Sequence, residues 1–421
     1  MLPLIKRLYP LCRSITGDGV RQSLKILREH IPLNVQEVAT GTSAFDWTIP
    51  QEWNIRQAYI ATMAGERVVD FAEHNLHIVH YSPPMDRIVE IEELRRHLHA
   101  IPERPDWIPY RTAYYAETWG FCITQNQLDA LTDNRYRVVI DSSLSNGQLT
   151  YGELVIPGAH PETVLVSSHI CHPSLANDNL SGIAVATALA CHLRTRKLRY
   201  TYRFLFAPGT IGSLAWLAMN ERLLGTIKYG LVLSCLGDAG GLTYKQSGQG
   251  DAAIDRIAAH VLRHDPAGNA RITPFVPFGY DERQFCSPGF DLPVGCLTRS
   301  PPGGYPEYHT SADNPGLLRE ESLTQSLSTL CRIVAAIEGD AHYRNLSPKG
   351  EPQLGRRGLY RGLGGQNSVA DEQMALLWVL YLSDGSHSLL DIAERAGLPF
   401  VLIRSAANAL LAADLLGPCD D

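Results

Sequence analysis

The sequence lacks the features that mark membrane and secreted proteins. None of its apolar runs approaches the roughly 20 residues that a membrane span requires, and residues 1–7 supply too few apolar side chains for a secretory signal. The nine cysteines are scattered and include no Cys-x-x-Cys pair, which argues against a disulfide framework or a cysteine zinc site. We therefore expect a soluble cytoplasmic protein with reduced thiols and no membrane partner.

A basic charge excess is also missing. The 421 residues include 37 basic and 44 acidic side chains, a net charge of -7, and a mild acidic excess repels phosphate backbones. We therefore do not expect nucleic acid as a partner. Hydrophobic residues make up 45% of the chain and charged residues 19%, which is typical of globular proteins. A chain of this length predicts two or three domains.

The order of predicted elements indicates the fold class. Helical spacing of Val20, Leu24 and Leu27 predicts a helix within residues 7–31, and the short strands of residues 36–130, with a helical stretch at 91–99, predict a β-rich unit. Further on, strands and helices alternate, which predicts an α/β fold with a doubly wound, mostly parallel sheet. The predicted strands cover 163–167, 200–207, 230–236 and 293–297, and the predicted helices cover 181–193, 212–224, 251–264 and 320–338.

The C-terminal tail has the pattern of a helix-turn-helix. A Gly-rich linker, Gly355–Gly365, leads to predicted helices at 371–382, 388–395 and 400–413. From residue 351 onward there are five arginines and nine acidic residues, whereas a DNA-binding face is basic. We expect this tail to pack against the chain or to form a homo-oligomer rather than to bind DNA.

Residues able to bind a metal follow the predicted strands. His169, His172 and Asp178 come after the first strand, Asp238 after the third and His309 after the last. In open α/β sheets, ligands bind beyond the carboxyl ends of the strands. Taken singly, Asp178 is a typical helix N-cap and Asp238 a typical turn residue. Their coincidence at the strand ends favours a zinc site, in which metal-bound water becomes a nucleophile near neutral pH.

These residues lead to a family resemblance. Their order is similar to that of zinc aminopeptidases of the co-catalytic, bacterial leucyl aminopeptidase type. Over nearly the whole chain, the sequence more closely resembles a bacterial family of aminopeptidase-like proteins of unassigned function. The motifs that carry this likeness are Phe45-Asp46-Trp47, Glu52-Trp53-Asn54, Trp119-Gly120-Phe121-Cys122, Cys171-His172-Pro173-Ser174, Asp281-Glu282-Arg283, Glu307-Tyr308-His309-Thr310-Ser311 and Ser383-Asp384-Gly385.

The resemblance implies a division of the chain. Residues 1–35 and 130–345 are expected to form an aminopeptidase-like zinc domain, and residues 36–129 an inserted β-rich domain. Residues 350–421 are expected to form a C-terminal winged-helix domain.

The sequence departs from the zinc aminopeptidases at two places. Those enzymes carry adjacent glutamates after the second strand, one a general base and one a metal ligand, where this sequence has Gly209-Thr210. Their His-x-Asp pair is His169-x-Cys171 here, so the carboxylate that would orient the histidine is missing. We therefore favour one zinc over two, with either His169 or His172 as the first ligand.

A general base must then come from elsewhere, and Glu307 and Glu282 are the candidates. We favour Glu307, because in an extended chain it would share a face with His309, two residues on. A loop salt bridge is an equally good interpretation of each glutamate. Near Tyr280, a candidate substrate contact, Arg283 could clamp a substrate carboxylate in bidentate fashion. Arg299 is a second candidate for that clamp.

The leading hypothesis is zinc-dependent hydrolysis of an amide bond next to a free amine in a small peptide or amino-acid conjugate. A second hypothesis is a non-hydrolytic protein that keeps the metal pocket to bind a small ligand or to transfer an acyl group, which the missing glutamates support. A third is a transcriptional regulator with a degenerate enzyme as its sensor, which the helix-turn-helix supports and its acidic charge opposes.

Overall fold

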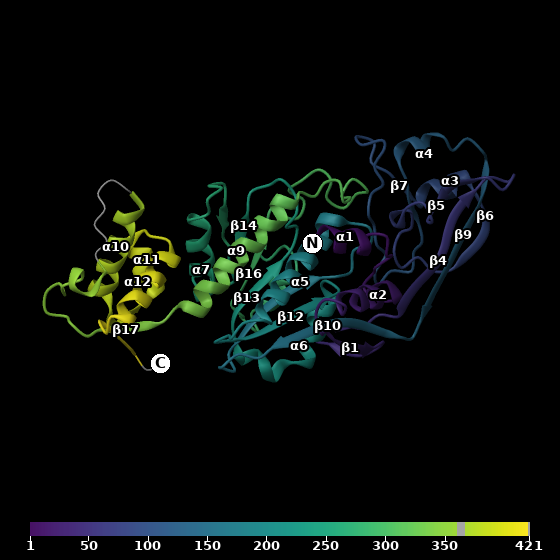
Figure 1. Ribbon diagram of the computed structural model, residues 1–421. Coiled ribbons are helices and arrows are strands. Elements are labelled where there is room, and N and C mark those ends of the chain that lie inside the picture. Colours follow the sequence, from purple (N-terminus) through teal and green to yellow (C-terminus); the bar gives the residue numbers. More distant parts are fainter. Residues whose placement is uncertain (360–366, 420–421) are drawn as a thin grey trace. The chain divides into compact units, whose positions relative to one another are not determined.

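The chain forms two compact units. The computed structural model describes residues 1–359 and 367–419 (Figure 1). The first unit consists of Met1–Ala252 and Arg271–Leu327, and the second of Ala253–Ala270 and Ser328–Asp421. The predicted Gly-rich linker, Gly355–Gly365, lies partly outside the described residues. Among the described helices, none has both the length and the apolar character needed to cross a membrane.

The first unit is built on a large sheet. Its strands are β1 (Asn34–Ala39), β10 (Gln148–Ile156), β11 (Thr163–His169), β12 (Thr201–Ala207), β13 (Ile227–Leu233), β14 (Thr243–Lys245), β15 (Arg271–Thr273) and β16 (Val294–Thr298). Their order is β1-β10-β12-β11-β13-β16-β14-β15, and the central strands β12, β11, β13 and β16 pair in parallel. This confirms the predicted α/β class with a mostly parallel sheet.

Helices cover the central strands of this sheet. Helix α5 (Gly182–Leu193) packs on β11, β12 and β13, while α2 (Asp18–Leu27) and α6 (Ile211–Met219) pack on β10 (Figure 1). Every residue of β11 is buried, so both faces of the sheet are covered there. The remaining helical segments of this unit are α1 (Leu2–Leu8), η2 (Ala176–Ser181), η3 (Glu221–Thr226) and α8 (Glu282–Phe285), and α9 (Glu320–Gly339) begins in the first unit and ends in the second.

The helix predicted within residues 7–31 is wrong in extent. The chain forms α1 and α2 with a break between them, and Gly17 in that break has a φ of 94°. A Cβ atom on Gly17 would lie 2.3 Å from the carbonyl oxygen of Trp53, so the close approach requires a glycine. The strand predicted at 230–236 is also displaced, because β13 ends at Leu233.

A smaller sheet with the order β5-β4-β9-β6 lies in the same unit. Its strands are β4 (Glu52–Ala61), β5 (Arg67–Asp70), β6 (Met85–Glu90) and β9 (Arg135–Ser145). Strand β9 begins beyond residue 129, the predicted end of the β-rich insertion. Shorter elements around this sheet are β2 (Ser43–Ala44), β3 (Trp47–Thr48), η1 (Asn75–His77), α3 (Ile91–Arg96), β7 (Leu98–His99), β8 (Phe121–Cys122) and α4 (Gln125–Asp129).

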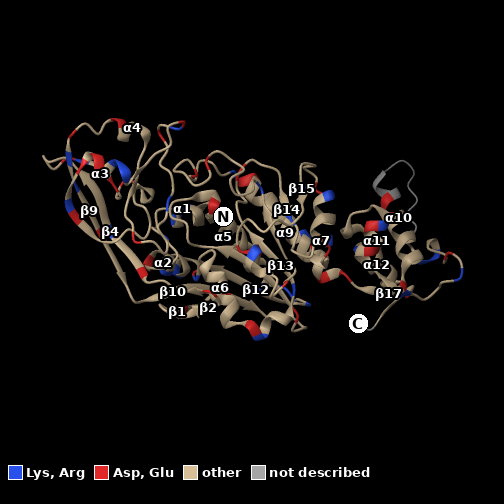
Figure 2. Ribbon diagram, turned by 180° about the vertical axis from the view of Figure 1, so that it is seen from behind, with Lys and Arg blue, Asp and Glu red and all other residues tan. Residues whose placement is uncertain are grey.

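The second unit contains the predicted winged helix. Its elements are α7 (Ala253–Arg263), β17 (His342–Asn345), η4 (Gly355–Arg357), α10 (Asn367–Leu382), β18 (Asp384–Ser388), α11 (Leu389–Ala396), α12 (Phe400–Ala412) and β19 (Leu416–Pro418). Acidic side chains lie on α10 and α11 (Figure 2). Arg404, the charged residue of α12, donates to the Gly339 carbonyl at 2.8 Å and to the Tyr343 hydroxyl at 3.1 Å. This arginine is therefore engaged within the unit.

Candidate metal centre

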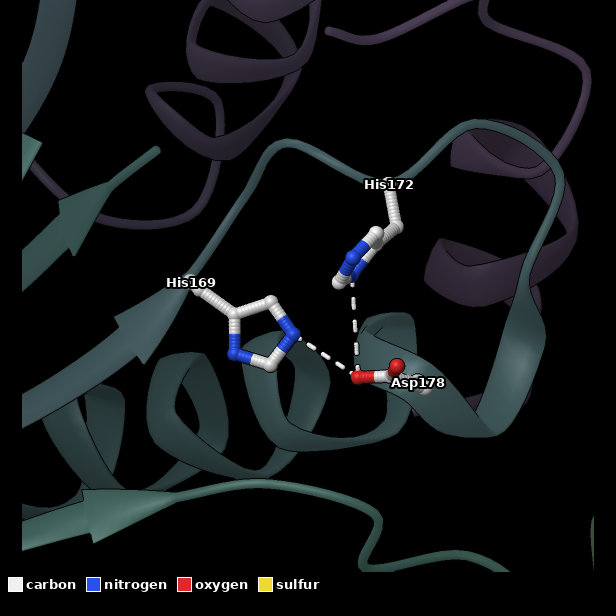
Figure 3. Close-up of side chains that lie close together, drawn as sticks. All are labelled: His169, His172 and Asp178. Carbon is white, nitrogen blue, oxygen red and sulfur yellow. Dashed lines mark hydrogen bonds and ion pairs between the residues drawn. The ribbon is translucent and has the colours of Figure 1, made fainter. Parts of the chain in front are cut away.

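Three side chains converge beyond the carboxyl end of β11 (Figure 3). His169 is the last residue of the strand, His172 follows in the loop, and Asp178 lies in η2. One ligand atom from each residue can be chosen so that all lie within 4.8 Å of one another, and the three residues are buried. A buried set of imidazoles and a carboxylate at this spacing fits a metal ion.

Asp178 is the centre of this arrangement. Its Oδ1 lies 2.8 Å from His169 Nε2 and 3.6 Å from His172 Nδ1. Its Oδ2 lies 3.0 Å from Nε2 of His309, which comes from the loop after β16. The side chain of Asp178 is fully buried, whereas that of His309 is 34% exposed. The structure thus places three of the sequence-predicted metal ligands, His169, His172 and His309, around a fourth, the carboxylate of Asp178.

The charge states of the cluster suit metal binding. Burial opposes the ionisation of Asp178, yet His172 and His169 hold its pKa well below the ordinary value. Burial lowers the pKa of His172 well below its ordinary value, although the charge of Asp178 acts in the opposite direction. A metal ion needs an ionised carboxylate, and the low pKa of Asp178 meets that requirement.

Asp313 fixes the backbone that carries Asp178. Its Oδ1 accepts hydrogen bonds from the amides of Ala176 at 3.1 Å and Asn177 at 2.6 Å. Its Oδ2 accepts from the Asp178 amide at 3.0 Å and the Tyr305 hydroxyl at 3.1 Å. Burial raises the pKa of Asp313 to about 7, whereas these donors favour its carboxylate form. Sequence reasoning missed this residue, and its position four residues after His309 was the available signal.

His169 is oriented without the carboxylate that the sequence lacks. The amide nitrogen of Asn179 lies 3.2 Å from His169 Nδ1, and the Tyr280 ring stacks on the imidazole with centroids 3.6 Å apart. Cys171, which replaces the carboxylate, points its thiol at the Gly209 carbonyl, 3.6 Å away. Burial raises the pKa of Cys171 to about 12, so this thiol is a poor nucleophile at neutral pH.

Tyr280, a predicted substrate contact, is part of the wall of the centre. Its hydroxyl lies 2.8 Å from His172 Nε2. Burial and the charge of Asp178 raise its pKa well above the ordinary value, so the phenol stays protonated. Tyr110, which sequence reasoning missed, places its ring edge-on to His172 and to His309, with centroids 5.3 and 5.2 Å apart.

The structure does not bring Asp238 into the cluster of His169, His172 and Asp178. Its oxygens accept hydrogen bonds from the Asn177 side chain at 2.8 Å, the Ser300 hydroxyl at 2.8 Å and the Gly240 amide at 2.6 Å. The reason is the end of β13 at Leu233, which leaves Asp238 five residues beyond the strand. Asp238 therefore supports Asn177, the neighbour of Asp178.

Arg299 is likewise a structural residue rather than a substrate clamp. It is buried, and its guanidinium donates to the Gly240 carbonyl at 2.8 Å, the Ser322 carbonyl at 3.3 Å and the Gln325 side chain at 3.1 Å. These bonds tie the loop after β13 to α9. Arg283, in contrast, lines a cavity beside Tyr280.

The two glutamates predicted as bases lie in different environments. Glu282 is buried and forms an ion pair with Lys245, and it accepts a hydrogen bond from the Tyr280 amide at 3.1 Å. Glu307 is part-exposed and lies in a turn, since its carbonyl accepts from the Thr310 amide at 3.1 Å. The extended chain that would align Glu307 with His309 is therefore absent at this turn.

Comparisons with known proteins agree with this architecture. A family model described as a domain of unknown function (DUF4910) matches residues 2–340, and one described as a winged helix-turn-helix matches residues 341–418. A Clostridium acetobutylicum protein, named for polysaccharide biosynthesis and an aminopeptidase-like domain, is 51% identical over 413 residues, which cover 98% of this chain and 95% of that relative.

Solved structures show the same fold. The crystal structure of a peptidase candidate from Clostridium acetobutylicum has a TM-score of 0.94 and 49% identity, over 99% of this chain and 96% of that chain. A zinc aminopeptidase from Bacillus subtilis has a TM-score of 0.57 and 14% identity, over 80% of this chain and 93% of that chain. The chain therefore has an aminopeptidase-like fold with a C-terminal winged helix.

Proposed function

We propose that this chain, which belongs to the family described as a domain of unknown function (DUF4910), is a zinc-dependent hydrolase of amide bonds in small peptides or amino-acid conjugates. The observation that carries the proposal is the buried convergence of His169, His172 and Asp178 beyond β11. The aminopeptidase-like fold supports it, and imidazole and carboxylate are common zinc ligands.

His169, His172 and Asp178 would hold the ion, and His309 would add a fourth donor beside the other oxygen of Asp178. Zinc in such a site supplies a water molecule acidic enough to act as a nucleophile near neutral pH. A cysteine nucleophile does not fit, because burial raises the pKa values of the Cys171 and Cys235 thiols.

Tyr280 and Glu307 would serve the reaction as a hydrogen-bond donor and a base. The protonated Tyr280 hydroxyl lies within hydrogen-bond distance of His172, so it can donate to a carbonyl oxygen bound at the centre. Glu307 is preferred as the base over Glu282, because Lys245 already neutralises Glu282. A general base contributes about 100- to 10,000-fold to such a rate.

Two further expectations concern the setting of the reaction. The name of the Clostridium acetobutylicum relative refers to polysaccharide biosynthesis, which supports testing sugar conjugates of amino acids beside peptides. All nine cysteines are free thiols, which supports a reducing compartment such as the cytoplasm.

Elemental analysis of the full chain, combined with a screen of aminoacyl amides, tests the proposal. We expect about one zinc per chain, its loss in Asp178→Asn, and its retention in Asp251→Asn, a matched change at an exposed aspartate. The Glu307→Gln variant should keep zinc and lose most of the turnover. Unchanged zinc in Asp178→Asn would refute the metal centre.

A second candidate function is metal-dependent binding of a small ligand without hydrolysis. The observation that favours it is the missing acidic pair at Gly209-Thr210, where Tyr280 fills the space that a side chain would need. Zinc retention together with no hydrolysis of any amide in the screen would favour this candidate over the hydrolase.

A further inference from the structure

A cavity of about 380 Å³ opens beside the metal centre within the first unit. Aromatic side chains from β3 and from two loops line it, together with aliphatic residues of α6. Those used below are Trp47, Tyr114, Tyr115, Gly209, Tyr280 and Arg283.

The cavity adjoins the metal centre through Tyr280. One face of the Tyr280 ring stacks on His169 at 3.6 Å, and its hydroxyl lies 2.8 Å from His172. The hydroxyl of Tyr114, another lining residue, lies 3.2 Å from the hydroxyl of Tyr110, and the Tyr110 ring lies edge-on to His172. A group held in the cavity is therefore separated from the metal ligands by a single layer of side chains.

Arg283 is the charged member of the described lining residues. Its Nε is buried and has no hydrogen-bond acceptor in the described part of the chain. Buried donors are nearly always paired, so an unpaired nitrogen on an arginine that lines a cavity leaves a place for an acceptor supplied by a ligand. Asp281, two residues away, accepts a hydrogen bond at Oδ1 from the Ser213 hydroxyl at 3.0 Å, and its Oδ2 is buried with no hydrogen-bond partner in the described part of the chain, so neither oxygen is hydrogen-bonded to Arg283. Carboxylate is the acceptor that best matches a guanidinium.

The aromatic part of the wall adds a second requirement. Trp47 and Tyr115 meet edge-to-face with ring centroids 5.4 Å apart, and both are about half exposed. The Tyr115 hydroxyl donates to the Thr48 carbonyl at 3.1 Å, which fixes the ring. Fixed, part-exposed rings offer a flat apolar surface to a planar group.

We propose that this cavity binds a carboxylate attached to a flat or ring-shaped group, with Arg283 holding the carboxylate, and so makes the protein selective for acidic amides. The selectivity rests on the proposed hydrolase function, whereas carboxylate binding does not. Arg283 is then a specificity-determining residue and Arg299 a structural one.

Calorimetric titration of the full chain with benzoate and benzamide tests the inference. The two probes have nearly the same shape and differ in charge. We expect benzoate to bind about tenfold or more tightly than benzamide, because a charge-assisted pair is stronger than a neutral one. Arg283→Met should abolish this preference, Arg283→Lys should keep part of it, and Arg222→Met, at an exposed arginine, should leave it unchanged. Circular dichroism checks that the variants are folded.

The same titration after removal of zinc by a chelator separates the possible sites. Benzoate binding that survives chelation and needs Arg283 supports the cavity, even if no amide is hydrolysed and the proposed hydrolase fails. Benzoate binding that disappears on chelation but is unaffected by Arg283→Met belongs to the metal and overturns the inference. Equal binding of benzoate and benzamide overturns it as well.

Discussion

Replacing Asp313 by asparagine should destabilise the protein and loosen its metal centre together. The carboxylate of Asp313 is fully buried and accepts four hydrogen bonds, from the amides of Ala176, Asn177 and Asp178 and from the Tyr305 hydroxyl. The bond from the Asp178 amide links Asp313 directly to the backbone of the central ligand. A change at Asp313 is therefore transmitted to the central ligand through one peptide unit.

The magnitude follows from the number of donors that lose an acceptor. Asparagine keeps one acceptor oxygen and replaces the other with an NH₂ group. That group is a donor, so it cannot accept the hydrogen bonds that the lost oxygen accepted. At least one donor at that oxygen becomes unsatisfied, since the Ala176 amide alone has a second acceptor in the Asp313 carbonyl at 2.9 Å, and each buried unsatisfied donor costs about 1–3 kcal/mol. We expect a loss of about 3 kcal/mol, a large part of the roughly 5–15 kcal/mol that stabilises a typical domain.

Urea unfolding at pH 8 measures this loss. That pH lies above the value of about 7 to which burial raises the pKa of Asp313, so the native side chain is ionised. Ser311→Ala is the matched control, because it removes the 2.9 Å bond from the Ile108 amide to Ser311 in the same loop without touching Asp178. Zinc content should fall in Asp313→Asn and not in the control. An unchanged urea midpoint and zinc content in Asp313→Asn would refute this account of the loop.

Two other substitutions test polar contacts elsewhere in the first unit. Hydrogen bonds from Arg21 hold the pKa of Glu52 at about 2, so the stability this pair contributes is complete above pH 4.5 and lost as pH falls toward 2. Glu52→Gln should remove about 1 kcal/mol of the stability that is lost on acidification, a small value because the pair is part-exposed. The melting temperature of the variant should therefore fall less steeply between pH 4.5 and 2, and an unchanged slope would contradict this. Arg13 is buried and donates to the carbonyls of His172 at 2.9 Å and Leu8 at 2.5 Å. Arg13→Met should cost about 2 kcal/mol in urea unfolding and weaken zinc retention in a chelator competition; unaltered retention would show that His172 does not need this support.

Much of the fold follows from the alternation of strands and helices. The segment at 163–167 is apolar and short, with a helical pattern after it, and it became β11 with His169 at its end. Because carboxyl ends of parallel strands meet at one edge, the sequence also predicted that His309 would lie near His169 and Asp178. Such an inference needs only the direction of each strand.

Features that depend on where strand pairing stops, or on long-range contacts, could not be predicted from the sequence. Asp238 looked like a strand-end ligand because apolar residues continue to Leu236, but β13 stops at Leu233 and Cys235 takes a φ of 49°. Hydrophobicity does not show where pairing stops, since a buried loop is also apolar. For Asp313 the sequence offered only its position four residues after His309, because its four donors come from residues more than one hundred positions away or from Tyr305.

The replacement of the acidic pair bears on the number of metal ions. A Cβ atom on Gly209 would lie 2.8 Å from the Tyr280 ring and 3.2 Å from His169 Cβ, so Tyr280 occupies the space into which a side chain at this position would project. The position of Tyr280 therefore requires a glycine at 209. Where the zinc aminopeptidases carry an acidic pair, this site has the neutral Tyr280 hydroxyl beside His172. Asp238 cannot supply the missing charge, because three protein groups already occupy its oxygens. Among the described residues, Asp178 is the one carboxylate paired with His169, His172 and His309. The centre therefore has too little negative charge to balance two divalent cations, and we expect it to hold one.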